Sequence, residues 1–165
     1  MTKFSTFFIL LLQLSISFSQ NNSGALRTAQ LMERRGETEN AVAIYSDILK
    51  KDHNQQAYIN LKKIFSRLEQ YDELASLIKV YKKRFPQKME PYLDLGETYW
   101  KLKKEASARR EWSFAEEKFG GNIDIYKKFF YLFTNLGLSE DVQSVIDRTR
   151  VKFNDPSILS MDIAN

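Results

Sequence analysis

The chain has 165 residues, of which 43% are hydrophobic and 28% are charged. This composition is typical of a folded globular protein and excludes the apolar-poor, highly charged class of disordered chains. Only 3 Pro and 6 Gly occur, too few for the many tight turns of a β-sandwich or barrel, so we expect an all-α fold. The formal charge of +4 comes from interspersed basic and acidic residues, and this pattern disfavours nucleic acid as a partner.

Residues 1–19 are predicted to be a cleaved signal peptide. One cation, Lys3, precedes an apolar run from Phe7 to Leu14, and small residues follow it. This order is typical of secretory signals, with cleavage before Gln20. The alternative is a retained membrane anchor, but the apolar run is shorter than the roughly 20 residues that a spanning helix needs. We therefore expect an exported protein of bacterial type, located in the periplasm or cell envelope or secreted.

Beyond the leader, positions of one chemical type recur every 33 or 34 residues, a period typical of stacked helical repeats. Turns begin in register at Gly36, Glu69, Lys103 and Gly137. Apolar columns accompany the turns at fixed offsets: Ala41, Leu74, Ala108 and Val142; Tyr45, Ile78, Trp112 and Ile146; Met32, Phe65, Tyr99 and Phe133; and Ala25, Tyr58, Tyr92 and Tyr126.

These columns predict about four antiparallel helix pairs in one repeat domain over residues 20–154. Offsets of four and seven residues place neighbouring columns on one helical face. The units are about 22–54, 55–88, 89–121 and 122–154. The helices are expected at 24–35 with 38–51, 55–68 with 71–84, 89–102 with 105–118, and 122–136 with 139–153. We expect an α-solenoid, because stacked pairs bury each other's apolar faces in a continuous core.

The third unit contains a spaced set of aromatic, aliphatic and small residues: Tyr92, Leu95, Gly96, Tyr99, Ala108, Trp112 and Ala115. Together with the segments GETENAVAIY and LEQYDELASL of the first two units, this set resembles the tetratricopeptide repeat (TPR) family. The resemblance covers about residues 22–154. It implies a TPR-like superhelix but no particular activity, because the motif is a packing code.

Two positions depart from the family pattern. The small residue that lets paired helices approach is present as Ala29 and Gly96, but Lys62 and Phe130 replace it in the second and fourth units. Side chains of this size must splay or rotate the two helices. We therefore expect the second and fourth pairs to be irregular.

No catalytic, cofactor-binding or metal-binding residues are predicted. The chain has no cysteine, so disulfides and thiolate metal sites are excluded. The single histidine, His53, lies in a polar segment between units, with no second histidine to complete a metal site. No phosphate-binding loop or hydrolase motif occurs. The sequence therefore predicts a protein that is not an enzyme and has no cofactor.

In folds of this kind the first helix of each pair lines a concave groove. The predicted groove residues are Gln30, Arg34, Lys63, Arg67, Glu97, Trp100, Lys101, Lys127, Tyr131 and Asn135. The set is mainly cationic with two aromatics, which favours an acidic or apolar-acidic segment of a protein as the partner. In the simpler alternative, Trp100 and Tyr131 belong partly to the core and the charges are only solvated.

The groove also resembles, in outline, that of family members that clamp a C-terminal carboxylate. Glu90 and Asp94 stand where those members place cations. We therefore do not expect that ligand.

The sequence thus predicts an exported, non-enzymatic scaffold that binds a partner segment in its groove, without stable membrane insertion once the leader is cleaved. The alternative is the N-terminal interaction or regulatory segment of a larger envelope enzyme or of a secretion or assembly machine. Residues 155–165 support it if they begin a further helix; otherwise they form a short tail on the last pair. A nucleic-acid-binding solenoid is less favoured.

Overall fold

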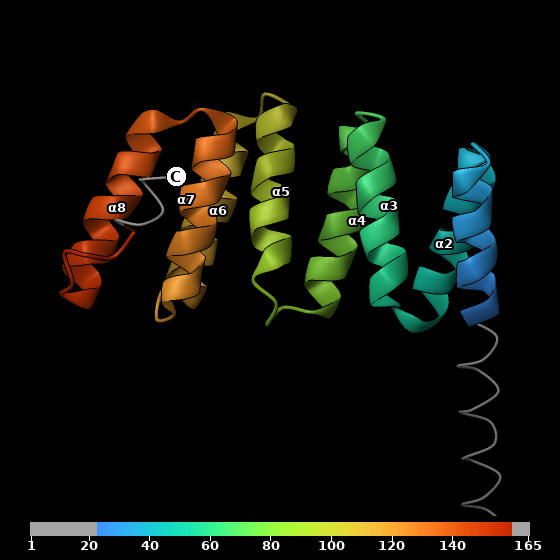
Figure 1. Ribbon diagram of the computed structural model, residues 1–165, viewed down its shortest axis with the longest axis horizontal. Coiled ribbons are helices and arrows are strands. Elements are labelled where there is room, and N and C mark those ends of the chain that lie inside the picture. Colours follow the sequence, from blue (N-terminus) through green and yellow to red (C-terminus); the bar gives the residue numbers. More distant parts are fainter. Residues whose placement is uncertain (1–22, 160–165) are drawn as a thin grey trace, which may run out of the picture. The chain divides into compact units, whose positions relative to one another are not determined.

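A computed structural model describes residues 23–159, and within these residues the chain is an array of helices joined by short turns (Figure 1). The predicted signal peptide and the last part of the tail lie outside the described residues. Among the described helices, none combines the length and apolar character needed to cross a membrane. The all-α repeat fold predicted from the sequence is confirmed.

The helices follow one another as the period predicts, with ends within one residue of the expected positions. The first described helix covers residues 23–34. The others are α2 (Thr38–Asp52), α3 (Gln55–Arg67), α4 (Tyr71–Arg84), α5 (Glu90–Lys101), α6 (Glu105–Phe119), α7 (Ile123–Leu136) and α8 (Ser139–Phe153). The chain forms two compact units, Met1–Leu77 (unit 1) and Ile78–Asn165 (unit 2), and α4 belongs to both.

The turn inside each helix pair has the same left-handed geometry. Gly36, Glu69, Lys103 and Gly137 have φ values of 81°, 56°, 60° and 71°. One residue further on, a backbone N–H donates to the carbonyl five residues back, at 2.9 Å in every case: Glu37 to Met32, Gln70 to Phe65, Lys104 to Tyr99, and Leu138 to Phe133. This hydrogen bond closes the last helical turn and satisfies carbonyls that would otherwise lack a donor. At all four predicted turn positions, therefore, the first helix of the pair ends in the same way.

Glycine is the residue suited to all four turns, but Glu69 and Lys103 occupy two of them. A side chain at positive φ costs roughly 1–2 kcal/mol. We expect Glu69→Gly and Lys103→Gly each to raise the free energy of unfolding by about 0.5–1 kcal/mol, since the greater entropy of glycine in the unfolded chain offsets part of the gain. Urea unfolding followed by circular dichroism measures the change. Gly36→Ala and Gly137→Ala should destabilise the protein. If all four variants had the same free energy of unfolding, the left-handed geometry of these turns would be contradicted.

Trp112 lies at the centre of the core of unit 2. It is 4% exposed, and the ring of Phe133 meets it edge-on with centroids 5.0 Å apart. Phe133 in turn stacks on Phe129 at 5.4 Å. The same column supplies Tyr45 to unit 1, where it is fully buried. Aromatic side chains from two of the repeat columns, Tyr45 and Trp112 from one and Phe133 from another, are thus buried, as the sequence predicts.

Gly96 sets the approach of α5 to α6. A Cβ at this position would lie 2.2 Å from Nε1 of Trp112, a separation that no side chain can tolerate. The equivalent residue of α7, Phe130, is itself buried, and α7 packs less extensively on α8 than α5 does on α6. The looser fourth pair agrees with the large residue at that position.

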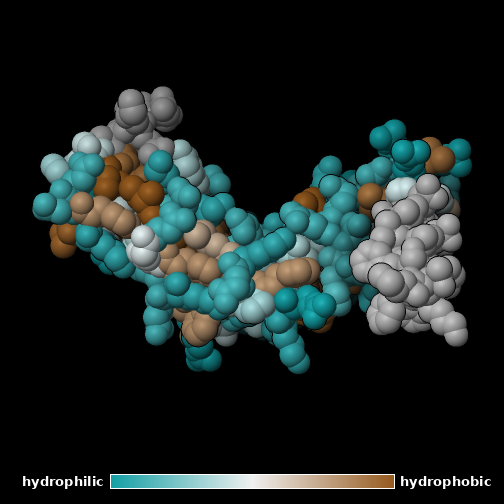
Figure 2. All heavy atoms as spheres, turned by 90° about the horizontal axis from the view of Figure 1, so that it is seen from below, coloured by the Kyte–Doolittle hydropathy of each residue, from teal (hydrophilic) through white to brown (hydrophobic). Residues whose placement is uncertain are grey.

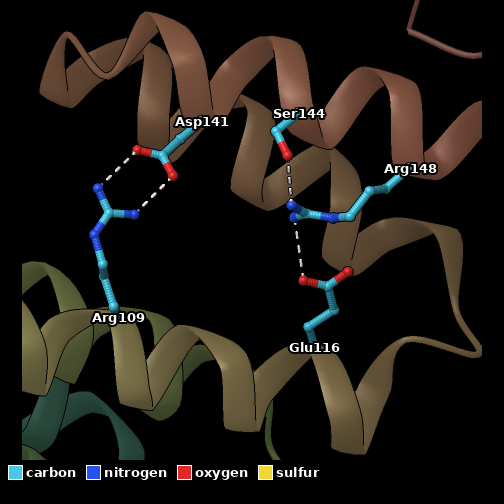
Figure 3. A network of polar contacts seen from close by, with 5 residues as sticks. All are labelled: Arg109, Glu116, Asp141, Ser144 and Arg148. Carbon is cyan, nitrogen blue, oxygen red and sulfur yellow. Dashed lines mark hydrogen bonds and ion pairs between the residues drawn. The ribbon is translucent and has the colours of Figure 1, made fainter.

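Ion pairs link α6 to α8 at two levels (Figure 3). The guanidinium of Arg109 binds both carboxylate oxygens of Asp141, at 2.8 and 3.2 Å. Nearer the ends of the helices, Arg148 donates to Glu116 at 3.1 Å and to Ser144 at 2.8 Å. Because residues early in one helix pair with residues early in the other, and late with late, α6 and α8 run parallel and in register.

The start of the tail folds back on unit 2. Residues 156–159 form turns, and Leu159 is buried in the core of this unit. Arg150 donates from Nε to the carbonyl of Ile158 at 3.2 Å. Hydrogen bonds from Ser157 hold the pKa of Asp155 below its usual value. Residues 160–165 lie outside the described part.

Candidate functional site

Four of the predicted groove residues line one pocket in unit 1. Gln30 and Arg34 are one turn apart on the helix over residues 23–34, and Lys63 and Arg67 are one turn apart on α3. The spacing of four residues places each pair on a single helical face. Together with Glu33 and Asn60 they enclose about 350 Å³.

The pocket has an excess of positive charge. Three cations, Arg34, Lys63 and Arg67, face one carboxylate, Glu33. Arg67 lies 3.8 Å from that carboxylate and is half-exposed, so the ion pair is long and solvated and contributes little to stability. The guanidinium therefore remains able to bind an incoming carboxylate, for which its planar fork of donors is suited.

Tyr45 of α2 fixes the carboxylate of Glu33 from below. Its hydroxyl donates to Glu33 at 3.3 Å, and its side chain is fully buried. Burial raises the pKa of Tyr45, and the negative charge of Glu33 raises it further, while a hydrogen bond from Asn60 acts in the opposite direction. The phenol thus stays protonated and continues to donate.

The sequence reasoning missed Glu33, Asn60 and Tyr45. Asn60 lies three residues before Lys63, and Glu33 lies three after Gln30, so helical spacing could have added both to the groove face. No sequence signal announces the hydrogen bond of Tyr45, because it depends on how α2 packs on the preceding helix.

The other predicted groove residues lie on α5 and α7 of unit 2. Trp100 is half-buried against the core, and the centres of its ring and of the Trp112 ring are 5.9 Å apart. The guanidinium carbon of Arg109 lies 5.8 Å from the centre of the Trp100 ring. Tyr131 is 52% exposed. Glu97 is half-buried, and the remaining three are exposed: Lys101, Lys127 and Asn135. Trp100 thus belongs partly to the core, and Tyr131 is the aromatic side chain of this set that is available at the surface.

A second pocket of unit 1, of about 750 Å³, has the opposite character. Glu37, Glu39 and Glu73 line it, together with apolar Phe65 and Leu68, and no cation does. Glutamates in the first turn of a helix stabilise the helix dipole, which accounts for Glu39 and Glu73 without a ligand. An acidic segment would be repelled here and attracted to the smaller pocket.

In residues 23–159 no group of three His, Asp or Glu side chains is arranged to hold a metal ion. His53 ends α2 in a left-handed conformation, with φ of 55°. Its backbone N–H donates to the carbonyl of Leu49, so its place in the fold is that of a helix-ending residue.

No family model matches the chain, and no curated protein matches it. Solved TPR structures do. MamA from Desulfovibrio magneticus RS-1 is 14% identical, with a TM-score of 0.53 over 79% of this chain and 72% of that protein. A TPR protein from Parabacteroides merdae is 14% identical, with a TM-score of 0.58 over 84% of this chain and 55% of that one.

The first TPR of Spaghetti (RPAP3), bound to the HSP90 peptide SRMEEVD, is 16% identical, with a TM-score of 0.51 over 72% of this chain and 95% of that one. At these identities the likeness concerns the fold alone. The chain therefore has a TPR-like fold, and at least one protein with this fold binds a peptide.

Proposed function

We propose that the chain is a non-catalytic interaction module that binds an acidic segment of a partner protein in the basic pocket of unit 1. The convergence of Arg34, Lys63 and Arg67 on one 350 Å³ pocket carries this proposal. The amides of Gln30 and Asn60 add uncharged hydrogen-bonding groups. The peptide bound by the RPAP3 repeat, SRMEEVD, contains three acidic residues and supports an acidic ligand.

A blocked peptide of alternating Leu and Glu, titrated into the full chain by calorimetry, tests the proposal. The same peptide with Gln for every Glu is the control, and we expect it to bind at least about tenfold more weakly, because it lacks charge-assisted hydrogen bonds. Arg34→Ala with Arg67→Ala should cause a similar loss. Arg35→Ala with Lys51→Ala removes two exposed cations outside the pocket and should change affinity little. If the Glu peptide binds the Arg34/Arg67 variant at full strength, the pocket is not the site.

Glu33 should oppose the acidic ligand. Glu33→Gln removes a negative charge from the pocket while keeping an oxygen that can accept the hydrogen bond of Tyr45. We expect the Glu peptide to bind this variant about fivefold more tightly, as removal of roughly 1 kcal/mol of repulsion predicts. The same titration measures it. Weaker binding would show that Glu33 is a ligand-positioning group and not a repulsive one.

We also propose that the module acts outside the cytoplasm, in the periplasm or envelope or as a secreted protein. The order of residues in the leader supports this, with one cation, an apolar run and then small residues. The intact mass of the protein recovered from an expressing bacterium should correspond to a chain that begins at Gln20. A mass that retains Met1 in the exported fraction would contradict leader cleavage.

A further inference from the structure

The last turns of three helices in unit 2 each present a cation at the same position of the repeat. Arg84, Lys118 and Lys152 follow one another at intervals of 34 residues, in the last turns of α4, α6 and α8, and all three are exposed. The period that arranges the core therefore also arranges a row of charge. In unit 1 the same column continues to Lys50, in the last turn of α2.

The three helix ends lie along one edge of unit 2. Lys82 of α4 pairs with Glu111 of α6 at 2.6 Å, and α6 pairs with α8 at two levels, as described above. The three helices are thus neighbours. Figure 1 shows that they end on its lower side, which Figure 2 views face-on.

Aromatic rings support the cations of this edge. The ammonium of Lys118 lies 3.3 Å from the hydroxyl of Tyr92 and 5.5 Å from the centre of its ring. Lys82 lies 4.9 Å from the centre of the same ring, and Lys152 lies 5.6 Å from that of Tyr126. Side chains held in this way keep an apolar stem on the protein and a charged head at its boundary.

Exposed apolar side chains accompany the row of cations. Val80 and Phe114 are 62% and 50% exposed, and they stand 34 residues apart, each four residues before its cation. Val151, next to Lys152, is 82% exposed. In Figure 2 apolar patches lie among hydrophilic residues on this side of unit 2. Apolar and cationic side chains thus recur together along the edge.

Cations in a last helical turn also stabilise the helix dipole, and this accounts for one cation per helix. It does not account for the exposed apolar side chains one turn earlier. Nor does it account for residues 74–89, which contain five cations and no acidic residue. Two nearby carboxylates on α6 already form ion pairs, Glu111 with Lys82 and Glu116 with Arg148. A third, Glu117, directly precedes Lys118 in the sequence.

We propose that this edge docks on a bilayer surface that contains anionic phospholipid. Cations near such a surface are attracted by its negative potential, while adjacent apolar side chains enter the boundary between headgroups and acyl chains. A row of both kinds across three helices suits an extended flat surface. The edge does not include the basic pocket of unit 1, so this proposal stands independently of the peptide-binding function.

Lysine acetylation of the full chain, read by mass spectrometry, tests the proposal at the level of single residues. Lys83 is exposed in the last turn of α4, next to Arg84. Vesicles of phosphatidylcholine with phosphatidylglycerol should reduce the modification of Lys83, Lys118 and Lys152 at least about threefold relative to the free protein. Three exposed lysines that lie away from this edge should be unaffected: Lys63, Lys101 and Lys103. Vesicles of phosphatidylcholine alone should protect neither set. Equal protection of the edge lysines and the control lysines from acetylation would overturn lipid docking. So would an oligonucleotide that protects the edge lysines as strongly as anionic vesicles do.

Charge reversal supplies a second measurement. Co-sedimentation of the full chain is compared on anionic and neutral vesicles, so that any contribution of the apolar leader is common to both. In Arg84→Glu/Lys152→Glu the anionic-specific binding should fall about tenfold or more, as expected for charges close to such a surface. The control Lys101→Glu/Lys103→Glu has the same net charge and should bind as the unmodified chain does. If the two variants lost binding to anionic vesicles equally, net charge alone would explain the binding, and the proposal of a docking edge would be wrong.

Discussion

Trp112→Ala should lower the free energy of unfolding by about 3–5 kcal/mol, the range for truncation of a buried large aromatic residue. Trp112 is 4% exposed and contacts Trp100 and Phe133 through their rings. Its removal would leave a cavity that rigid neighbouring helices cannot close. Urea unfolding followed by circular dichroism measures the loss, with the midpoint as the most reliable quantity.

Trp100→Ala is the matched control, because Trp100 is only half-buried. We expect a clearly smaller loss than for Trp112. Similar losses for the two tryptophans, or unchanged stability of Trp112→Ala, would contradict the register in which Trp112 belongs to the central apolar column.

Gly96→Val should destabilise the protein by about 3 kcal/mol, at the upper end of the cost of overpacking. A Cβ at Gly96 would lie 2.2, 2.5 and 2.8 Å from three atoms of the Trp112 indole, so α5 and α6 would have to separate. Thermal unfolding measures the effect. The control is Gly121→Ala, where a Cβ meets nothing within 4 Å and a change of no more than about 0.5 kcal/mol is expected.

A double-mutant cycle localises this effect. The smaller ring in Trp112→Phe should make Gly96→Ala less costly than it is beside tryptophan, with a coupling energy of about 0.5–3 kcal/mol, as found for residues in contact. Additive effects of the two substitutions would show that Gly96 is not limited by Trp112.

The arrangement of helices could be predicted because one period fixes many positions at once. Gly36 and Gly137 signal left-handed turns by residue type, whereas Glu69 and Lys103 do so only through their place in the column. The division into two compact units could not be predicted in this way, since a helix such as α4 has the same apolar pattern whether one unit or two share it.

The candidate site could be predicted only in part. Helical spacing found Gln30, Arg34, Lys63 and Arg67, because residues four apart share a face whatever their neighbours are. The hydrogen bond from Tyr45 to Glu33 depends on how α2 packs on the preceding helix, and the partial burial of Trp100 depends on the position of Trp112. Overall composition also concealed the cationic edge, since +4 over the whole chain includes a segment with five cations and no acidic residue.

The central claim is that the basic pocket of unit 1 captures an acidic segment. Backbone amide spectra of the full chain, recorded during titration with the blocked Leu–Glu peptide, test it most directly. We predict that the largest shifts occur within residues 29–35 and 59–68, which flank the pocket, and that the Gln peptide causes none of comparable size. Shifts confined to α5–α8, or equal shifts with both peptides, would contradict the claim.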